Sequence, residues 1–167
     1  AAQHLVVAAR AADDRVDLFV VDAGAEGMTL TQQMSIASDT QYQVDLAGTP
    51  AVRLGDAGTG WNNWNQTLTE AMILLAAQAV GGADQALKIT ADYSKERKQF
   101  GVPISSFQVL QHRMVDQYME YEQSKSMLYM ATMAQDSGQG LAKAAAALKV
   151  QIGRSGRQIG QAAIQNH

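Results

Sequence analysis

The sequence YSKERKQFGVPISSFQVLQH, residues 93–112, marks the point where one long helix ends and the next begins. Gly101 permits a sharp helix ending, and Pro103 and Ser105 are typical of a helix start. Arg97 lies at this corner, where its guanidinium can hold a pyrophosphate through two hydrogen bonds. Basic residues at a helix C-terminus also compensate the helix dipole in the ordinary way, so single residues do not decide between the two interpretations.

Long helical patterns lie on both sides of this corner. Apolar residues recur at three- and four-residue steps over about residues 66–99 and again over about residues 105–135. A third helical pattern begins near Leu141 and continues to His167. Long helices joined by short loops predict an antiparallel bundle. Its apolar face would remain uncovered, so we expect a fourth helix from the parent protein, a partner, or both.

The first third of the chain predicts an antiparallel sheet. Short alternating runs rich in β-branched residues lie at residues 5–9, 16–22, 28–34, 41–46 and 52–54, with turn-forming residues between them. Strands followed by helices give an α+β fold class. We expect two partial domains, a middle β-domain over residues 1–60 and a helical domain over residues 61–167.

Composition narrows the class of protein. Apolar residues make up 47% of the 167 residues and charged residues 17%, which is typical of a chain that forms a core. The net charge of −3 argues against nucleic acid or an anionic membrane as a partner, and no stretch reaches transmembrane length. There are no cysteines, which fits a cytoplasmic protein. His4, His112 and His167 show no clustered spacing, so we expect no metal site.

Taken as an ordered string, residues 93–112 closely resemble the signature Tyr-x-x-x-Arg-x-Gln-Phe-Gly-x-Pro-Ile-x-x-Phe-Gln-x-x-Gln-His of acyl-CoA dehydrogenases. The resemblance extends over nearly the whole chain. Residues 5–10 and 18–22 look like strands of the family's middle β-domain, and residues 76–87 look like the first long helix of its C-terminal four-helix bundle. Residues 99–117 and 151–157 look most like the small-subunit branch associated with pimeloyl-type or steroid side-chain acyl-CoAs.

The resemblance implies a flavoprotein oxidoreductase that binds FAD. By this resemblance Arg97 contacts the FAD pyrophosphate across a dimer interface, with Gln99 and Phe100 flanking the cofactor. Gln108 meets its adenosine or ribityl portion, and Gln165 fits the first position of a Gln-x-x-Gly-Gly motif. The implied reaction is α,β-dehydrogenation of an acyl-CoA thioester, with an electron-transfer flavoprotein as acceptor. The implied assembly is a homo- or hetero-oligomer, a dimer of dimers.

The catalytic base is not found among these residues. The usual glutamate of the family lies beyond the Gln-x-x-Gly-Gly motif, and some relatives place it at the position of Ala71 instead. Glu70 is one residue away, which turns its side chain by about 100°. Thr69 and Met72 stand where many relatives have a charged pair near the substrate. We therefore assign no catalytic residue and expect the fragment alone to be inactive.

Two functions agree with these residues, and a third is a further alternative. The chain is either a fragment of a catalytic acyl-CoA dehydrogenase whose base lies elsewhere, or a non-catalytic subunit that completes the FAD site of a hetero-oligomeric enzyme. Ala71 and Met72 favour the second, while residues 97–108 are neutral between them. An oxygen-using relative, an acyl-CoA oxidase, is the third.

Overall fold

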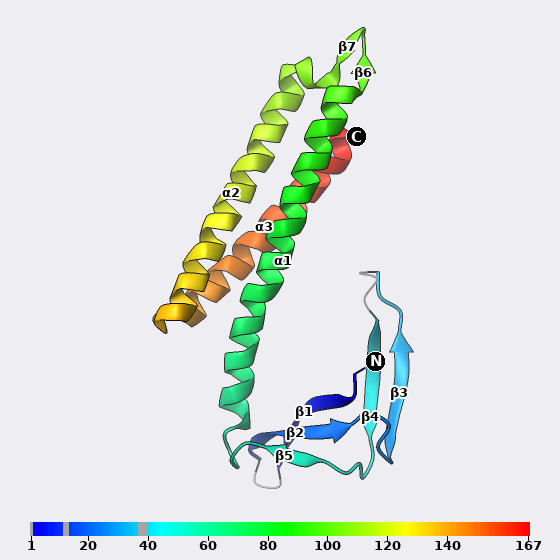
Figure 1. Cartoon of the computed structure of the whole chain (residues 1–167), viewed down its shortest axis with the longest axis vertical. Helices are drawn as coiled ribbons and strands as arrows, with labels where there is room; N and C mark the ends of the chain where they lie inside the picture. Colours follow the sequence, from blue (N-terminus) through cyan, green and yellow to red (C-terminus); the bar gives the residue numbers. More distant parts are fainter. Residues whose placement is uncertain (1, 12–13, 37–39) are drawn as a thin grey trace. The chain divides into compact units, whose positions relative to one another are not determined.

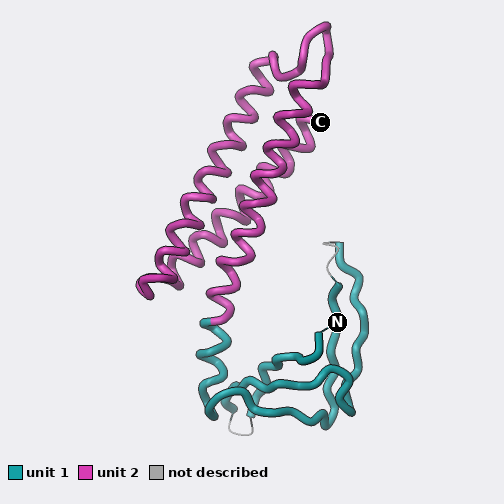
Figure 2. Tube along the Cα trace, in the orientation of Figure 1, with its two compact units in different colours: residues 1–66 teal, residues 67–167 magenta. Residues whose placement is uncertain are grey.

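The computed structural model describes residues 2–11, 14–36 and 40–167. The chain forms two compact units, residues 1–66 and 67–167, which Figure 2 shows in different colours. Strands make up most of the first unit and long helices the second, so the expected α+β fold class is confirmed (Figure 1). The assignment of residues 1–60 and 61–167 to two domains stays a prediction. Among the described residues, no helix combines the length and the apolar character needed to cross a bilayer.

The first unit contains two antiparallel sheets. One has the order β1-β2-β5, formed by His4–Arg10, Val16–Asp22 and Val52–Leu54. The other pairs β3 (Met28–Gln33) with β4 (Gln41–Leu46). These bounds match the predicted strands to within one residue at each end. The alternation of apolar and polar residues predicted β1 correctly because one face of this strand is half-buried while the other is exposed.

A buried carboxylate on the central strand of the first sheet holds the segment that leads into the first helix. Asp17 on β2 is 1% exposed, and its Oδ1 accepts a hydrogen bond from the Gly58 backbone N–H at 2.7 Å. Its Oδ2 lies 3.4 Å from Arg53 Nε on β5. Gly60, which begins α1, is buried directly against the Asp17 backbone. The start of α1 is therefore held by tertiary contacts.

The second unit is a helical hairpin extended by a third helix. The helices are α1 (Gly60–Glu96), α2 (Gln108–Ser137) and α3 (Leu141–Asn166), and Figure 1 shows α2 and α3 side by side. The buried core is built from small and aliphatic side chains of all three helices, among them Ile73, Val80, Ala131, Ala145 and Leu148. Small residues at the contact let α2 and α3 approach closely.

Helix starts were predicted less well than helix ends. We expected the first helix to begin near Gln66 and the second near Ser105, but α1 begins at Gly60 and α2 at Gln108. Ser105 lies in a short 3₁₀ turn, η1 (Ile104–Ser106), and the residue before α2 is Phe107, which gives no side-chain cap. The first helix also ends at Glu96, earlier than the predicted Gln99, because residues 98–103 form a hairpin.

A polar cluster fixes the register between α2 and α3. The Glu120 side chain on α2 is only 13% exposed, and its Oε2 accepts a hydrogen bond from Ser155 Oγ at 2.7 Å and another from Gln151 Nε2 at 3.3 Å. Gln151 Nε2 also lies 2.9 Å from Ser155 Oγ, and Arg154 lies 4.0 Å from the other carboxylate oxygen. The Glu120 carboxylate is therefore held between the two helices by hydrogen bonds.

Replacing Glu120 with Ala should lower the free energy of unfolding by about 2 kcal/mol, because buried Ser155 loses its acceptor. Glu122 provides a matched control two residues away. Its side chain is 38% exposed and pairs with Lys125 of the same helix, so Glu122→Ala should change stability by less than about 0.5 kcal/mol. Urea unfolding of the intact protein measures both. Equal effects of the two variants would show that the cluster does not stabilise the helix pair.

Candidate cofactor site

Arg97 stands immediately after the last residue of α1. Its backbone N–H donates to the Tyr93 carbonyl oxygen at 2.8 Å, and its own carbonyl oxygen accepts from the Ile104 N–H at 2.8 Å. The backbone is thus held from both sides while the side chain is exposed. Lys95, the basic residue in the last turn of α1, already pairs with Asp92 at 3.1 Å. In the part of the chain that the structure describes, no carboxylate lies within ion-pairing distance of the Arg97 guanidinium.

A tight hairpin follows Arg97. Strands β6 (Lys98–Gln99) and β7 (Val102–Pro103) pair with the register Lys98↔Pro103 and Gln99↔Val102. The two turn residues, Phe100 and Gly101, have φ values of +56° and +84°. A turn with two positive φ angles suits Gly101, whereas a phenylalanine in this region is strained.

The Phe100 ring projects into solvent. It is 92% exposed, and its recorded ring contact is an edge-to-face one with Phe107, with the centroids 6.1 Å apart. An apolar ring of this size that is neither buried nor in a relaxed backbone conformation gains nothing for the fold of this unit. Local strain that is kept at an exposed position points to a ligand or partner.

The start of α2 completes this corner. Gln108 is the first residue of α2 and is exposed. The first turn has neither a side-chain cap nor an acidic residue. The Leu110 N–H already donates to the Phe107 carbonyl oxygen at 3.0 Å, and the positive end of the helix dipole at this turn favours an anion. Gln111 does not compete for this role, since its Nε2 donates to the Ser105 carbonyl oxygen at 2.8 Å.

The end of α3 lies beside the end of α1. The Tyr93 ring stacks on the His167 ring with centroids 4.4 Å apart and planes 23° apart, and the Tyr93 hydroxyl donates to the His167 carbonyl oxygen at 3.0 Å. Figure 1 shows the C-terminus next to the last turns of α1. Gln165 is exposed two residues before His167. The structure thus places Arg97, Gln99, Phe100, Gln108 and Gln165 at one end of the helical unit, all of them exposed.

Sequence reasoning missed the residues that bring α3 to this end. Tyr93 opens the signature and was not given a role, and His167 was weighed only as a metal ligand. Neighbouring Asn166 is 4% exposed, and its side-chain amide has no hydrogen-bond partner among residues 2–11, 14–36 and 40–167. The spacing of one signature could not reveal a contact between residues 74 positions apart.

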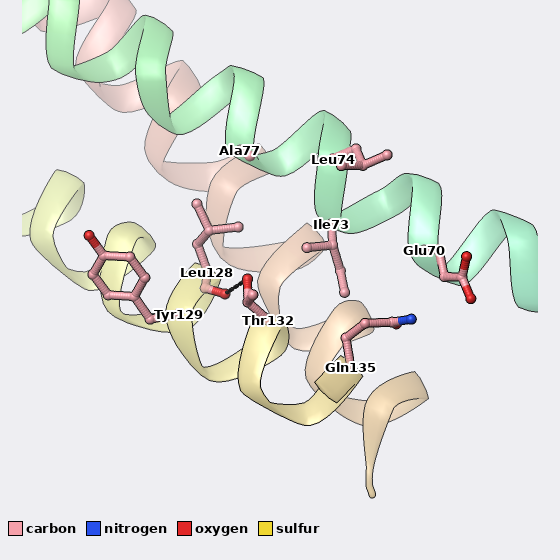
Figure 3. Close-up of a pocket in the computed structure, with 8 residues that line it drawn as sticks. All are labelled: Glu70, Ile73, Leu74, Ala77, Leu128, Tyr129, Thr132 and Gln135. Carbon is pink, nitrogen blue, oxygen red and sulfur yellow. Dashed lines mark hydrogen bonds between the residues drawn. The ribbon is translucent and has the colours of Figure 1, made fainter. Parts of the chain in front are cut away.

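A separate apolar groove of about 470 Å³ runs between α1 and α2. Figure 3 shows the residues that line it: Glu70, Ile73, Leu74, Ala77, Leu128, Tyr129, Thr132 and Gln135. Glu70 is on the face of α1 that borders this groove, while Met72 packs against the core of the unit. Ala71 therefore faces a different direction from Glu70.

The shifted pKa values belong to surface ion pairs outside the corner at Arg97. A hydrogen bond from Lys88 to the Asp84 carboxylate raises the pKa of Lys88, and one to the Glu122 carboxylate raises the pKa of Lys125. Both pairs join residues of one helix turn and are partly or fully exposed. Exposed pairs of this kind contribute little to stability. No group of three or more metal-ligating side chains occurs among the described residues.

The family follows from comparison with known proteins. The family model for the acyl-CoA dehydrogenase C-terminal domain matches residues 58–167. The chain therefore belongs to the acyl-CoA dehydrogenase family.

Individual relatives support this assignment. The probable acyl-CoA dehydrogenase YngJ of Bacillus subtilis is 32% identical over 158 residues, which are 91% of this chain and 42% of YngJ. CarC of Acetobacterium woodii, a subunit of a caffeyl-CoA reductase–Etf complex, is 28% identical over 158 residues, again 91% of this chain and 42% of the relative. The chain thus spans less than half the length of these curated relatives.

Solved structures show the same fold. A variant of the Tcur3481–Tcur3483 steroid ACAD is 36% identical with a TM-score of 0.86, covering 99% of this chain and 44% of that chain. PigA with FAD and proline is 28% identical with a TM-score of 0.89, covering 99% and 46%. The expected fold, an antiparallel β segment followed by long helices of the acyl-CoA dehydrogenase type, is confirmed by these similarities.

Proposed function

We propose that the chain is part of an FAD-dependent acyl-CoA dehydrogenase and that its helix corner binds the FAD pyrophosphate. The observation that carries the proposal is an exposed Arg97, without an ion pair to any described residue, next to an exposed Phe100 held at positive φ. A planar guanidinium binds a diphosphate through parallel hydrogen bonds, and the uncapped start of α2 favours the same negative charge. PigA, similar over 99% of this chain, was solved with FAD.

Each site residue has a role that follows from its position. Arg97 neutralises the pyrophosphate, and the Phe100 ring covers an apolar face of the nucleotide. Gln99, Gln108 and Gln165 carry side-chain amides that donate to and accept from the sugar and base portions of the cofactor. When bound, FAD supplies the hydride acceptor of the dehydrogenation, and the chain's residues bind and orient it.

All these side chains are exposed within this chain, so residues outside it, from the rest of the protein or from a second protomer, enclose the cofactor. We propose that a second protomer does so, in a dimer of dimers in which Arg97 serves the FAD of its neighbour. An electron-transfer flavoprotein is the proposed acceptor, because CarC is named as a subunit of an Etf complex. The proposed substrate is an acyl-CoA with a bulky acyl group, because a steroid ACAD is 36% identical to this chain.

A specific observation favours a second candidate function, a subunit that completes the FAD site without supplying a base. Glu70 is the acidic residue nearest to position 71, and it borders the groove between α1 and α2. The neighbouring Ala71 side chain cannot accept a proton. If the catalytic base is not supplied elsewhere in this protein, a partner subunit must supply it.

Mixing the FAD-loaded intact protein with acyl-CoA thioesters separates the two functions. Bleaching of the flavin by the purified subunit alone supports the catalytic function. Bleaching that requires a second subunit supports the non-catalytic one. Failure of both preparations to retain FAD would contradict both functions, since both need the cofactor at the Arg97 corner.

Replacing Phe100 should raise the stability of the protein and weaken its binding of FAD. Phe100→Gly should raise the free energy of unfolding by about 1 kcal/mol, since glycine adopts positive φ without strain. The same variant should bind FAD several-fold more weakly, because it lacks the exposed ring. Val150→Ala is the control, since Val150 is also exposed, at 73%, but lies well inside α3, away from this corner. Unfolding and FAD titrations of the intact protein measure both effects, and unchanged FAD affinity would remove Phe100 from the site.

A further inference from the structure

The two proposed cofactor residues farthest apart in sequence are joined through Tyr93. Its backbone carbonyl oxygen accepts the hydrogen bond of the Arg97 N–H at 2.8 Å, one helical turn later. Its side-chain hydroxyl donates to the His167 carbonyl oxygen at 3.0 Å, two residues after Gln165. We propose that Tyr93 is a positioning residue that holds the end of α3 against the end of α1 and so sets Arg97 and Gln165 around one cofactor.

Two contacts of different kinds act on the same pair. The rings of Tyr93 and His167 stack with their centroids 4.4 Å apart and their planes nearly parallel. The hydrogen bond from the Tyr93 hydroxyl to the His167 carbonyl oxygen holds the far end of the Tyr93 ring in place. His167 is fixed in turn by a hydrogen bond between its Nδ1 and the Ala163 carbonyl oxygen at 2.8 Å. Stacking and hydrogen bonding together restrict both the separation and the rotation of the last turn of α3.

The end of α3 also has packing of its own. Asn166 in the last turn is 4% exposed. α1 meets the end of α3 at a shallow apolar surface that includes Ile89 and Ile164, which are 51% and 79% exposed. Tyr93 adds the specific contact, a ring stack and a hydrogen bond to His167, which fixes the position of the last turn and with it that of Gln165.

The inference rests on the proposed function, because it assigns Tyr93 to the FAD site. Removing both contacts with Tyr93→Leu should raise the dissociation constant for FAD about tenfold, the combined size of a stacked aromatic pair and a neutral hydrogen bond. Tyr93→Phe keeps the ring and loses the hydroxyl hydrogen bond, so it should raise the dissociation constant by an intermediate amount, about threefold. His167→Ala removes the stack and keeps the carbonyl acceptor, so its effect should also be intermediate, about threefold.

The double variant Tyr93→Leu with His167→Ala gives the sharpest test. If the two rings act as a pair, adding His167→Ala to Tyr93→Leu should change the dissociation constant by less than about twofold. Tyr118→Leu is the control, since Tyr118 is 56% exposed and lies on α2 away from this contact. FAD titration of the folded, FAD-free intact protein measures affinity separately from stability, so a role in stability alone would leave these constants unchanged.

The outcomes separate this inference from the proposed function. If Arg97→Ala retains FAD normally, the proposed function fails and the inference with it. If Arg97→Ala loses FAD while Tyr93→Leu binds it like the wild type, the inference alone is overturned. Fully multiplied effects in the double variant would also overturn it. If Tyr93→Leu does not fold, the variants Tyr93→Phe and His167→Ala test the inference, because each keeps one of the two contacts. Weaker FAD binding in both variants supports the pairing. Normal FAD binding in either one overturns it.

Discussion

Arg97→Ala should weaken FAD binding about 100-fold, the effect expected when a charge-assisted, bidentate contact to a diphosphate is lost. The fold should be unaffected, because the Arg97 side chain is exposed and makes no ion pair within the described part of the chain. Its backbone hydrogen bonds to Tyr93 and Ile104 do not depend on the side chain. Equilibrium FAD titration of the intact, FAD-free protein gives the result, with thermal unfolding as a check on the fold.

Two companion variants make this result specific. Arg97→Lys keeps the charge and loses the planar fork, so its FAD affinity should fall between those of the wild type and Arg97→Ala. Lys95→Ala removes a cation two residues away that is already paired with Asp92, and it should leave FAD affinity nearly unchanged. Equal losses for Lys95→Ala and Arg97→Ala would indicate a diffuse effect of positive charge and no direct contact.

Gly60→Ala should destabilise the protein by about 3 kcal/mol, at the upper end of the range for overpacked sites. A Cβ atom at this position would lie 2.4 Å from the Asp17 Cα and 2.7 Å from the Leu18 nitrogen. Backbone atoms cannot move aside as a flexible side chain would. The start of α1 would have to shift from β2 and weaken the Asp17 hydrogen bond to the Gly58 N–H.

Gly82 is a matched control inside the same helix. A Cβ atom there would meet no heavy atom within 4 Å, so Gly82→Ala should stabilise the protein by about 0.5–1 kcal/mol through helix propensity. Urea unfolding of the intact protein compares the two variants. A stabilising Gly60→Ala would mean that α1 does not approach β2 as closely as the structure shows.

Local patterns predicted the elements that depend on local chemistry. The strands Val16–Asp22, Gln41–Leu46 and Val52–Leu54 were predicted to the residue, because alternation and turn residues are written in neighbouring positions. The start of α1 was missed, because it depends on the packing of Gly60 against Asp17, which is far away in sequence. The start of α2 was missed for a similar reason. It follows Phe107, which is not a capping residue, so the rules for helix starts do not point to it.

The candidate site was predictable only in part. The signature supplied Arg97, Gln99, Phe100 and Gln108, which lie close in sequence and therefore close in space. Their binding roles stay predictions. The predicted antiparallel bundle already puts the end of α3, and with it Gln165, near the end of α1. The stacking of Tyr93 on His167 at that end could not follow from periodicity. The strained φ of Phe100 was also invisible, because phenylalanine is a poor candidate for such a turn position.

Three glycines of α3 lie outside its close contacts with the described part of the chain. They are Gly153, Gly156 and Gly160, which cost helix propensity. A Cβ atom at any of the three would meet no heavy atom within 4 Å in the described part of the chain. Close approach of α2 and α3 instead uses Ala131, Ala145 and other small residues of the core.

The structure of the intact protein with FAD bound tests the central claim most directly. The account predicts the Arg97 guanidinium within about 3 Å of a pyrophosphate oxygen, with the Phe100 ring against the same cofactor. A pyrophosphate bound elsewhere, with the Arg97 side chain in bulk solvent, would contradict it.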